Sequence, residues 1–222
     1  MVSRRPPAQT SKPASKAVNG PGRPKDLGKR NAILEAAKQL FTAQGFAGAS
    51  MDQIAAEAGV SKLTVYSHFG DKEALFLAAV QSKCDELMPA DLFQQDVSGP
   101  LGERLTTIGR GFFRLVTSEE ALGTQRMLLT PGQCDDSLKR LFWEAGPKRT
   151  CDALAGMLQM ACDAGELSID DVGRASEQFF ALLKGKLHER AMCGVGPQPS
   201  EAEMLAHIDA TVAMFLRAYA VR

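Results

Sequence analysis

The segment SKLTVYSHF, residues 61–69, is rich in side chains that can donate hydrogen bonds. Ser61 can cap a short helix here, and Val65 and Phe69 then fall on one apolar face. The other face carries Lys62, Leu63, Thr64, Ser67 and His68. Ammonium, hydroxyl and imidazole groups near the start of a helix are able to contact base edges in a DNA major groove. The chemistry that this segment suggests is therefore hydrogen bonding to DNA.

The stretch before it predicts the helix that would position these side chains. Ser50 followed three residues later by Gln53 is a capping-box pattern, and Gly59 supplies a turn that can use positive φ. Ala55, Gly59 and Val65 stand at offsets of four and ten, so that a small residue lets two helices cross and a branched residue fills the crossing. We interpret the pair as a helix-turn-helix. The alternative is an ordinary short helical hairpin, since any such hairpin with a glycine shares the pattern.

The charge distribution is uneven, although the chain of 222 residues has a formal net charge of zero. Residues 1–30 hold eight Lys or Arg against one Asp, and the remainder therefore holds 18 basic and 25 acidic residues. One end of the protein thus carries the excess positive charge, as expected of an end that faces a polyanion. A basic tail that only maintains solubility is the alternative.

Residues 1–25 are rich in Pro, Ser, Ala, Lys and Gly, and we predict a disordered basic arm there. Within this arm, PGRPK resembles the core of an AT-hook, in which an extended backbone lies in a DNA minor groove. Arg23 and Lys25 are the candidate contacts of this short motif.

The rest of the chain predicts helices alone. Apolar residues recur at helical spacing from Lys29 onward, and no alternating run is long enough for a strand. We predict an all-α protein of about nine helices, with a DNA-binding domain over residues 26–87 and a regulatory domain over residues 98–222. The dipeptide Gly146-Pro147 predicts a bend inside the longest helix.

The composition argues against several classes of protein. No apolar run approaches the roughly 20 residues of a membrane span, and the N-terminus lacks a signal peptide, so we expect a cytoplasmic protein without membrane contact. The carboxylates are scattered, and neither a nucleophile in a recognisable setting nor a phosphate loop is present, which argues against an enzyme. The cysteines are widely spread and include no CxxC pair: Cys84, Cys134, Cys151, Cys162 and Cys193. This spacing predicts reduced thiols and no metal site.

Residues 33–76, ILEAAKQLFTAQGFAGASMDQIAAEAGVSKLTVYSHFGDKEALF, resemble the DNA-binding region of TetR-family transcriptional regulators almost throughout. The second region is less diagnostic. Its segment LFWEAGPKR, residues 141–149, followed by GEL at residues 165–167, is similar to the efflux-repressor-like branch named for AefR or AcrR.

That resemblance implies roles for individual residues. Base-edge contacts fall on Lys62, Leu63 and Thr64, and phosphate contacts fall on Ser50, Tyr66, His68 and Lys72. Three of these positions leave an alternative open. Tyr66 could belong to the core with a solvated hydroxyl, His68 could lie on the helix surface without a contact, and Leu63 could either meet a thymine methyl or simply pack.

The resemblance also implies a homodimer formed by the last two long helices, and hence a palindromic operator in double-stranded DNA. The apolar residues there exceed what one helix pair facing water should show, so some of them must form the subunit's own core. No cofactor is implied.

The resemblance further implies a pocket for a small apolar effector among the helices of the second region. Its candidate lining is Phe112, Phe113, Met127, Phe142, Trp143, Met157, Met160 and Phe179. Met and Phe at helical spacing are also ordinary core residues, which is the alternative for each. We therefore expect a ligand-responsive repressor, released from DNA by a small apolar molecule, and keep a cysteine-based redox sensor as the second possibility.

Overall fold

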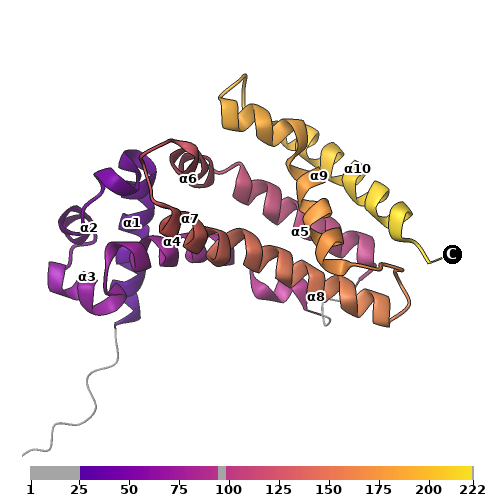
Figure 1. Cartoon of the computed structure of the whole chain (residues 1–222), viewed down its shortest axis with the longest axis horizontal. Coiled ribbons are helices and arrows are strands. Elements are labelled where there is room, and N and C mark those ends of the chain that lie inside the picture. Colours follow the sequence, from indigo (N-terminus) through magenta and orange to yellow (C-terminus); the bar gives the residue numbers. More distant parts are fainter. Residues whose placement is uncertain (1–25, 95–98, 222) are drawn as a thin grey trace, which may run out of the picture.

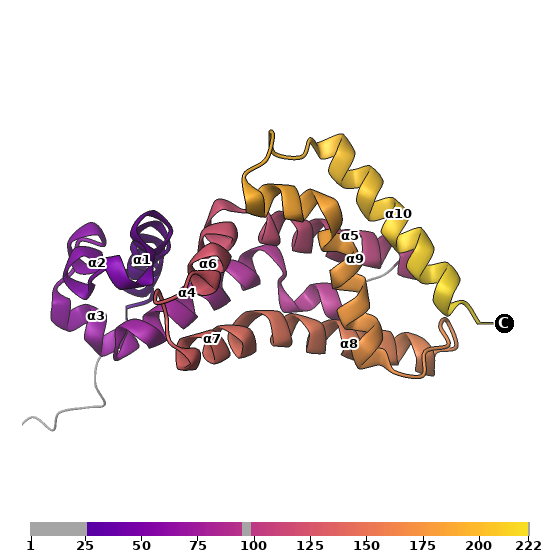
Figure 2. The same cartoon turned by 45° about the horizontal axis from the view of Figure 1, so that its top comes forward.

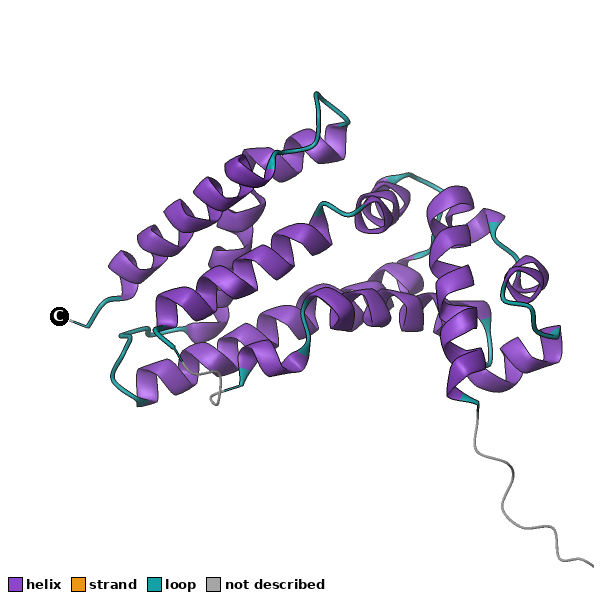
Figure 3. Ribbon diagram, turned by 180° about the vertical axis from the view of Figure 1, so that it is seen from behind, coloured by secondary structure: helices purple, strands orange, loops and turns teal. Residues whose placement is uncertain are grey.

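The computed structural model describes residues 26–94 and 99–221, and the regular elements in these ranges are all helices (Figures 1 and 3). Three helices gather at one end of the molecule, and a fourth leads from them into the larger helical region (Figure 1). One isolated β-bridge, between Leu167 and Ala220, joins two loops. The predicted fold class is thus confirmed. The predicted arm over residues 1–25, with Arg23 and Lys25, lies outside the described residues.

The N-terminal unit consists of four helices: α1 (Leu27–Gly48), α2 (Met51–Glu57), α3 (Lys62–Phe69) and α4 (Lys72–Leu87). The side chains of Asp26 and Asp71 accept hydrogen bonds from backbone amides of the first turns of α1 and α4, as N-caps do. The sequence pattern ends the first helix at Gly45, whereas the helix resumes beyond it to Gly48. Gly45 itself is non-helical, with φ of 71°, so it introduces a kink rather than an end.

The larger region follows with a short 3₁₀ turn and six helices. Its elements are η1 (Ala90–Phe93), α5 (Leu101–Val116), α6 (Glu119–Leu129), α7 (Asp136–Trp143), η2 (Glu144–Lys148), α8 (Arg149–Asp163), α9 (Val172–Cys193) and α10 (Glu201–Tyr219). The segment η2 is one π-helical turn around Pro147, and α7 and α8 continue directly from its two ends. The bend predicted at Gly146-Pro147 is therefore a widened turn in one continuous rod, and counting this rod once gives nine α-helices in the described ranges.

Two hydrophobic cores hold the molecule together. The N-terminal core surrounds Ile33, Ile54, Val65 and Leu75, none of which has any solvent exposure. The core of the larger region surrounds α5 and takes in residues of α8, α9 and α10. Helix α10 lies along the outer side of α5 and α9 (Figure 2). Burial of this kind drives folding at roughly 25 cal/mol per Å² of apolar surface.

The N-terminal core does not end at the predicted domain boundary. Met127 of α6 and Leu138 of α7 are buried members of it, although both lie in the region assigned to regulation. The backbone amide of Phe46 points at the Met127 sulfur, 3.1 Å away. The N-terminal unit is thus packed directly against two helices of the larger region.

Helix α9 contains a sharp kink at Gly185, where φ is 42° and ψ is −159°. That conformation is essentially restricted to glycine, because a Cβ would be strained there. The kink interrupts the helical hydrogen-bond ladder, and the Leu183 carbonyl instead lies 2.9 Å from Nε2 of His207 on α10. A side chain from the neighbouring helix therefore satisfies a backbone group at the kink.

Candidate nucleic-acid interface and regulatory cavity

Helices α2 and α3 have the geometry that the sequence pattern predicts. Ser50 accepts a hydrogen bond from the Gln53 amide at 3.2 Å, and the Gln53 side chain accepts from the Ser50 amide at 2.9 Å, which completes the capping box. Gly59 turns the chain with φ of 64°. Ala55 and Val65 are buried where the two helices cross. One face of α3 is therefore fixed to the core, and the opposite face is presented to solvent.

The outward face of α3 carries two large exposed side chains. Leu63 is 79% exposed and Tyr66 is 41% exposed. Leu63 therefore does not pack in this subunit, and an apolar contact with a thymine methyl is the alternative that the geometry favours. Tyr66 is not a core residue, since its ring stands at the surface.

The hydroxyls of α3 are held by short local bonds. Thr64 Oγ1 lies 2.8 Å from Ser61 Oγ, and Ser67 donates to the Thr64 carbonyl at 2.8 Å. These bonds orient both hydroxyls before any ligand arrives. An acceptor lone pair on each oxygen remains available to a base edge or a bridging water.

Lys62 is anchored to the helix before it. Its Nζ lies 2.9 Å from Oδ2 of Asp52 on α2, and this hydrogen bond, together with the charge of Asp52, raises the pKa of the lysine. The pair is solvent-exposed, so it adds little to stability. It does hold the lysine in one orientation, and a DNA contact by Lys62 has to compete with Asp52.

Lys72 stands at the first turn of α4, beside the N-terminus of α2. Its ammonium donates to the Ala49 carbonyl at 3.0 Å and lies over the Phe46 ring at 4.4 Å. Partial burial lowers the pKa of this lysine. The carbonyl of Ala49 immediately precedes Ser50, so Lys72 positions one positive charge close to the cap of α2, where a phosphate contact is expected.

His68 is half-buried, and its Nδ1 is enclosed without a hydrogen-bond partner among the described residues. Its ring lies 6.2 Å from that of Phe69. A phosphate contact by this residue therefore stays a prediction, and Nδ1 is not the ring atom that is exposed for it. Arg30 of α1, which the sequence pattern did not single out, lies over the Phe69 ring at 5.2 Å and adds a cation at the end of α3.

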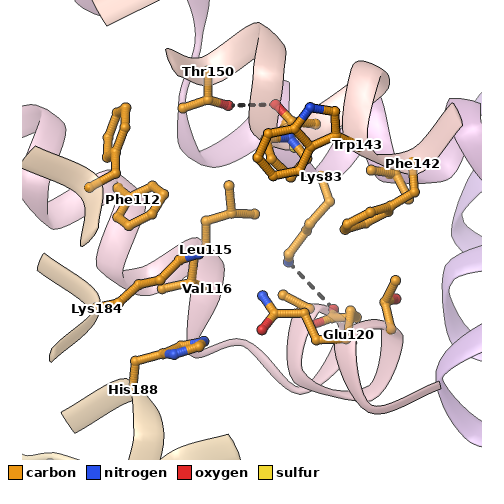
Figure 4. A pocket seen from close by; sticks show the side chains of 18 of the residues that line it. Lys83, Phe112, Leu115, Val116, Glu120, Phe142, Trp143, Thr150, Lys184 and His188 are labelled. Atoms are coloured by element: carbon orange, nitrogen blue, oxygen red, sulfur yellow. Dashed lines mark hydrogen bonds and ion pairs between the residues drawn. The ribbon is translucent and has the colours of Figure 1, made fainter. Parts of the chain in front are cut away.

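A cavity of about 620 Å³ lies between α4 and the helices of the larger region (Figure 4). Its wall draws residues from α1, from each α-helix from α4 to α9, and from the π-turn. The π-turn and the kink of α9 both contribute to this wall, which includes Gly146, Pro147 and Gly185. Single π-turns inside α-helices frequently mark functional sites.

Three of the predicted pocket residues lie on the cavity wall: Phe112, Phe142 and Trp143. The other five lie elsewhere. Phe113, Met157 and Phe179 are fully enclosed in the core of the larger region, Met160 packs against that core, and Met127 belongs to the N-terminal core.

The sequence reasoning missed the polar part of the wall. Lys83 of α4 lies 3.4 Å from Glu120 of α6 and 3.6 Å from Glu86, which in turn lies 3.6 Å from Lys38 of α1. This chain of ion pairs links α1, α4 and α6. Its Lys83–Glu120 pair borders the cavity (Figure 4). Burial alone would raise the pKa of Glu120, but its own backbone hydrogen bond and the Lys83 ammonium lower it overall.

Helix α9 supplies a second polar group at the opposite side, with Lys184 and His188 projecting from it toward the cavity (Figure 4). No side-chain pattern in the sequence distinguishes these two from ordinary helix-surface residues. Their position depends on the kink at Gly185, which lies between them.

Two cysteines also line the cavity. Burial raises the pKa of the Cys84 thiol to about 11, and burial likewise raises the pKa of Cys151. A thiol becomes nucleophilic only as the thiolate, so both are poor redox sensors at neutral pH. The redox alternative therefore finds no support. Among the described residues, no group of three or more His, Cys, Asp or Glu could hold a metal ion.

No helix in the described ranges is long and apolar enough to cross a bilayer.

Family models of known proteins match both the N-terminal and the C-terminal region of the chain. Residues 33–79 match the model of the TetR family of bacterial regulatory proteins, and residues 103–221 match the C-terminal domain of AefR-like transcriptional repressors. The HTH-type transcriptional regulator YdeS of Bacillus subtilis is 30% identical over 150 residues, which cover 66% of this chain and 71% of that protein.

Solved structures agree with these matches. A TetR-family regulator from Mesorhizobium loti superposes with a TM-score of 0.75 at 29% identity, covering 90% of this chain and 100% of the other. The flavonoid-responsive regulator FrrA gives a TM-score of 0.65 at 34% identity, covering 87% and 98%. With its helix-turn-helix at one end and an AefR-like region at the other, the chain belongs to the TetR family of DNA-binding transcriptional regulators.

Proposed function

We propose that the protein is a homodimeric repressor that binds a palindromic operator and is released when a small, largely apolar molecule occupies the cavity. The observation that supports this most directly is the course of α4. Its first residue, Lys72, contacts the loop before α2, and its second half provides Val80, Lys83 and Cys84 to the cavity wall. One rigid helix therefore touches both sites.

A second connection runs through α6. Ala121 and Thr124 line the cavity, whereas Met127, less than a turn further along, is buried in the N-terminal core. A ligand that displaces α6 would consequently change the packing around Phe46 and α1. Such a shift acts on DNA binding only if the ligand has a higher affinity for one of two arrangements, so ligand and operator must favour opposite ones.

The dimer is expected to form through the outer faces of α9 and α10. The large apolar residues of these helices are mostly buried within the subunit: Phe179, Phe180, Leu183, Ile208, Val212 and Phe215. Leu182 on α9 and Met214 on α10 remain 40% and 43% exposed. Pairing the two helices with their symmetry mates would cover these side chains and set two copies of α3 about one DNA turn apart, about 34–36 Å.

The relatives support a ligand response without fixing its direction. FrrA is described as flavonoid-responsive, and FasR of Mycolicibacterium smegmatis, 40% identical over 77 residues or 35% of each chain, is described as an activator. Repression is proposed for this chain because its C-terminal region matches the AefR-like repressors.

The test is to select genomic fragments that the purified protein binds, and then to measure operator affinity with and without candidate compounds. A palindromic motif is expected, and recovery without any motif would refute operator recognition by α3. The cavity is tested with Ala121→Trp, which fills it. This variant should bind operator normally but ignore compounds that release the wild type. Leu129→Trp, an exposed position on the same helix, is the control that should respond normally.

A further inference from the structure

The imidazole of His188 is a buried polar group without a partner. The residue is only 7% exposed and lines the cavity, and its Nε2 makes no hydrogen bond within the described residues. Buried polar atoms are nearly always paired, because an unpaired one loses its hydration without compensation. An unpaired nitrogen in a cavity wall is therefore expected where a bound ligand supplies the hydrogen-bond partner.

The backbone of α9 is built to hold His188 in this place. The kink at Gly185 redirects the helix one turn before His188, and the contact between His207 and the Leu183 carbonyl stabilises the kink. A helix that served only to pack against its neighbours would need neither the glycine conformation at Gly185 nor the contact of His207 with the Leu183 carbonyl. They are explicable if the orientation of this turn relative to the cavity matters.

The charges of the wall indicate an uncharged ligand. Three lysines and three glutamates line the cavity, which gives no net charge from these groups: Lys38, Lys83, Lys184, Glu120, Glu177 and Glu189. Burial and the nearby Lys184 lower the pKa of His188, so its imidazole is neutral at physiological pH. A carboxylate or an ammonium ligand would find no net counter-charge here.

The apolar part of the wall is rich in aromatic side chains. Six aromatic side chains line it: Phe41, Phe76, Phe112, Phe142, Trp143 and Phe180. Phe112 of α5 and Phe180 of α9 already pack with ring centroids 4.3 Å apart. Flat aromatic molecules gain offset-stacked and edge-to-face contacts with such rings, which an alkyl chain cannot make.

We propose that the cavity takes an uncharged aromatic molecule bearing a hydroxyl group, and that this hydroxyl forms a hydrogen bond with His188 Nε2. The inference rests on the proposed function, since it names the class of ligand for the same cavity. It makes His188 the residue that distinguishes a hydroxylated ring from its unsubstituted parent.

The test uses flavone and a set of monohydroxyflavones that differ in the position of the hydroxyl group, with dodecanoate as an aliphatic, charged comparison. Affinities are measured by calorimetry for the wild type, His188→Leu and His188→Gln. Leucine fills a similar volume without a polar atom, whereas glutamine can still form a hydrogen bond. Because His188→Leu removes an unpaired buried nitrogen, its melting temperature should equal or exceed that of the wild type, which verifies folding.

At least one hydroxyl isomer should bind the wild type roughly five- to tenfold more tightly than flavone, the gain typical of one hydrogen bond. That gain should vanish in His188→Leu, where flavone itself binds unchanged, and should return in part in His188→Gln. The proposal is overturned if flavone binds as tightly as every isomer, if the gain survives in His188→Leu, or if none of the compounds binds.

These results can be separated from a failure of the proposed function. If flavone or dodecanoate binds best and lowers operator affinity, the hydroxyl proposal is wrong while ligand-controlled DNA binding stands. If compounds bind in the cavity and operator affinity never changes, the regulatory proposal fails whatever the role of His188.

Discussion

Leu63 is the most exposed large apolar side chain of α3, and this exposure determines which contacts it can make. A leucine at 79% exposure contributes little to the fold, so its replacement should leave stability almost unchanged. Its branched side chain can still exclude water around a thymine methyl in the major groove.

We therefore expect Leu63→Ala to lower specific affinity while the melting temperature stays the same. The decisive comparison replaces thymine by uracil at each operator position in turn, which removes only the methyl group. At one position in each half-site, uracil should weaken wild-type binding by about 1 kcal/mol but leave Leu63→Ala unaffected. Equal losses in both proteins at every position would show that Leu63 reads no methyl group.

Lys72 and Tyr66 provide a second contrast, because only one of them carries charge. Lys72→Met should reduce the steepness of the log–log salt dependence by about 0.9 per phosphate contact, since one counterion fewer is released. Tyr66→Phe should weaken binding to all sequences equally without changing that slope. Anisotropy titrations over a salt series measure both quantities, and a sequence-dependent loss in either variant would contradict the assignment to phosphates.

The pKa of Cys84 leads to a prediction about alkaline stability. The fold raises this pKa from 9.0 to about 11, so the unfolded chain ionises first as pH rises. The folded state should lose about 1 kcal/mol of stability from this group between pH 8 and pH 10, and nothing below pH 8. Urea unfolding of Cys84→Ala should show a smaller loss over the same interval. An identical pH dependence in both proteins would mean that the thiol is not shielded.

For individual residues, the sequence predicts interactions within one helix turn but not interactions between helices. The caps at Ser50, Ser61 and Asp71 follow from side chains that bond backbone groups three residues away, so spacing alone reveals them. The pairing of Lys62 with Asp52 and the position of His188 depend on how helices pack, which residue spacing does not contain.

Among the elements, α9 departs furthest from what its sequence suggests. Its apolar spacing predicts a straight helix, and a glycine inside a helix is ordinarily only a small loss of stability. The kink becomes visible only when the His207 contact and the packing of α10 are known. Helical periodicity likewise identifies apolar faces without showing which part of a face closes on a core and which borders a cavity. Phe112 and Phe113 are adjacent in the sequence, but Phe112 borders the cavity whereas Phe113 is enclosed in the core.

Gly185→Ala tests whether the kink is required. At φ of 42° a Cβ is strained, and it would lie 3.1 Å from His207 Cε1, so we expect a loss of about 1–3 kcal/mol in unfolding free energy. Gly156→Ala, inside α8 with open space around it, is the matched control and should gain roughly 0.4–1 kcal/mol. Equal stability of the two variants would indicate that α9 straightens without penalty.

For the molecule as a whole, the two regions that the sequence predicts as domains are not independent in packing. Met127 and Leu138 complete the N-terminal core from the other side of the predicted boundary. The predicted boundary between residues 87 and 98 rests on local sequence patterns, which cannot report which distant helices share a core. A tilt of the N-terminal unit would therefore change the packing around Met127 of α6 and Leu138 of α7.

The proposed dimer gives a prediction for the assembly. Leu182→Glu with Met214→Glu should leave the helical content unchanged but produce a monomer, because it places charge at the centre of the expected interface. Operator affinity should then fall on the order of a hundredfold, as the two half-sites are no longer bound together. Leu129→Glu, an exposed residue of α6, is the control. Light scattering that reports a dimer for the double variant would place the interface elsewhere.

Trp143 is the only tryptophan of the chain, and it stands in the cavity wall while remaining 55% exposed. All of the indole emission therefore comes from one place, beside the π-turn and facing the space where an effector would enter. An aromatic compound that absorbs in the near ultraviolet would accept this excitation energy when bound and would leave it undisturbed when free. The protein thus contains its own optical reporter, and collections of unlabelled compounds can be screened for cavity binding before any operator is known.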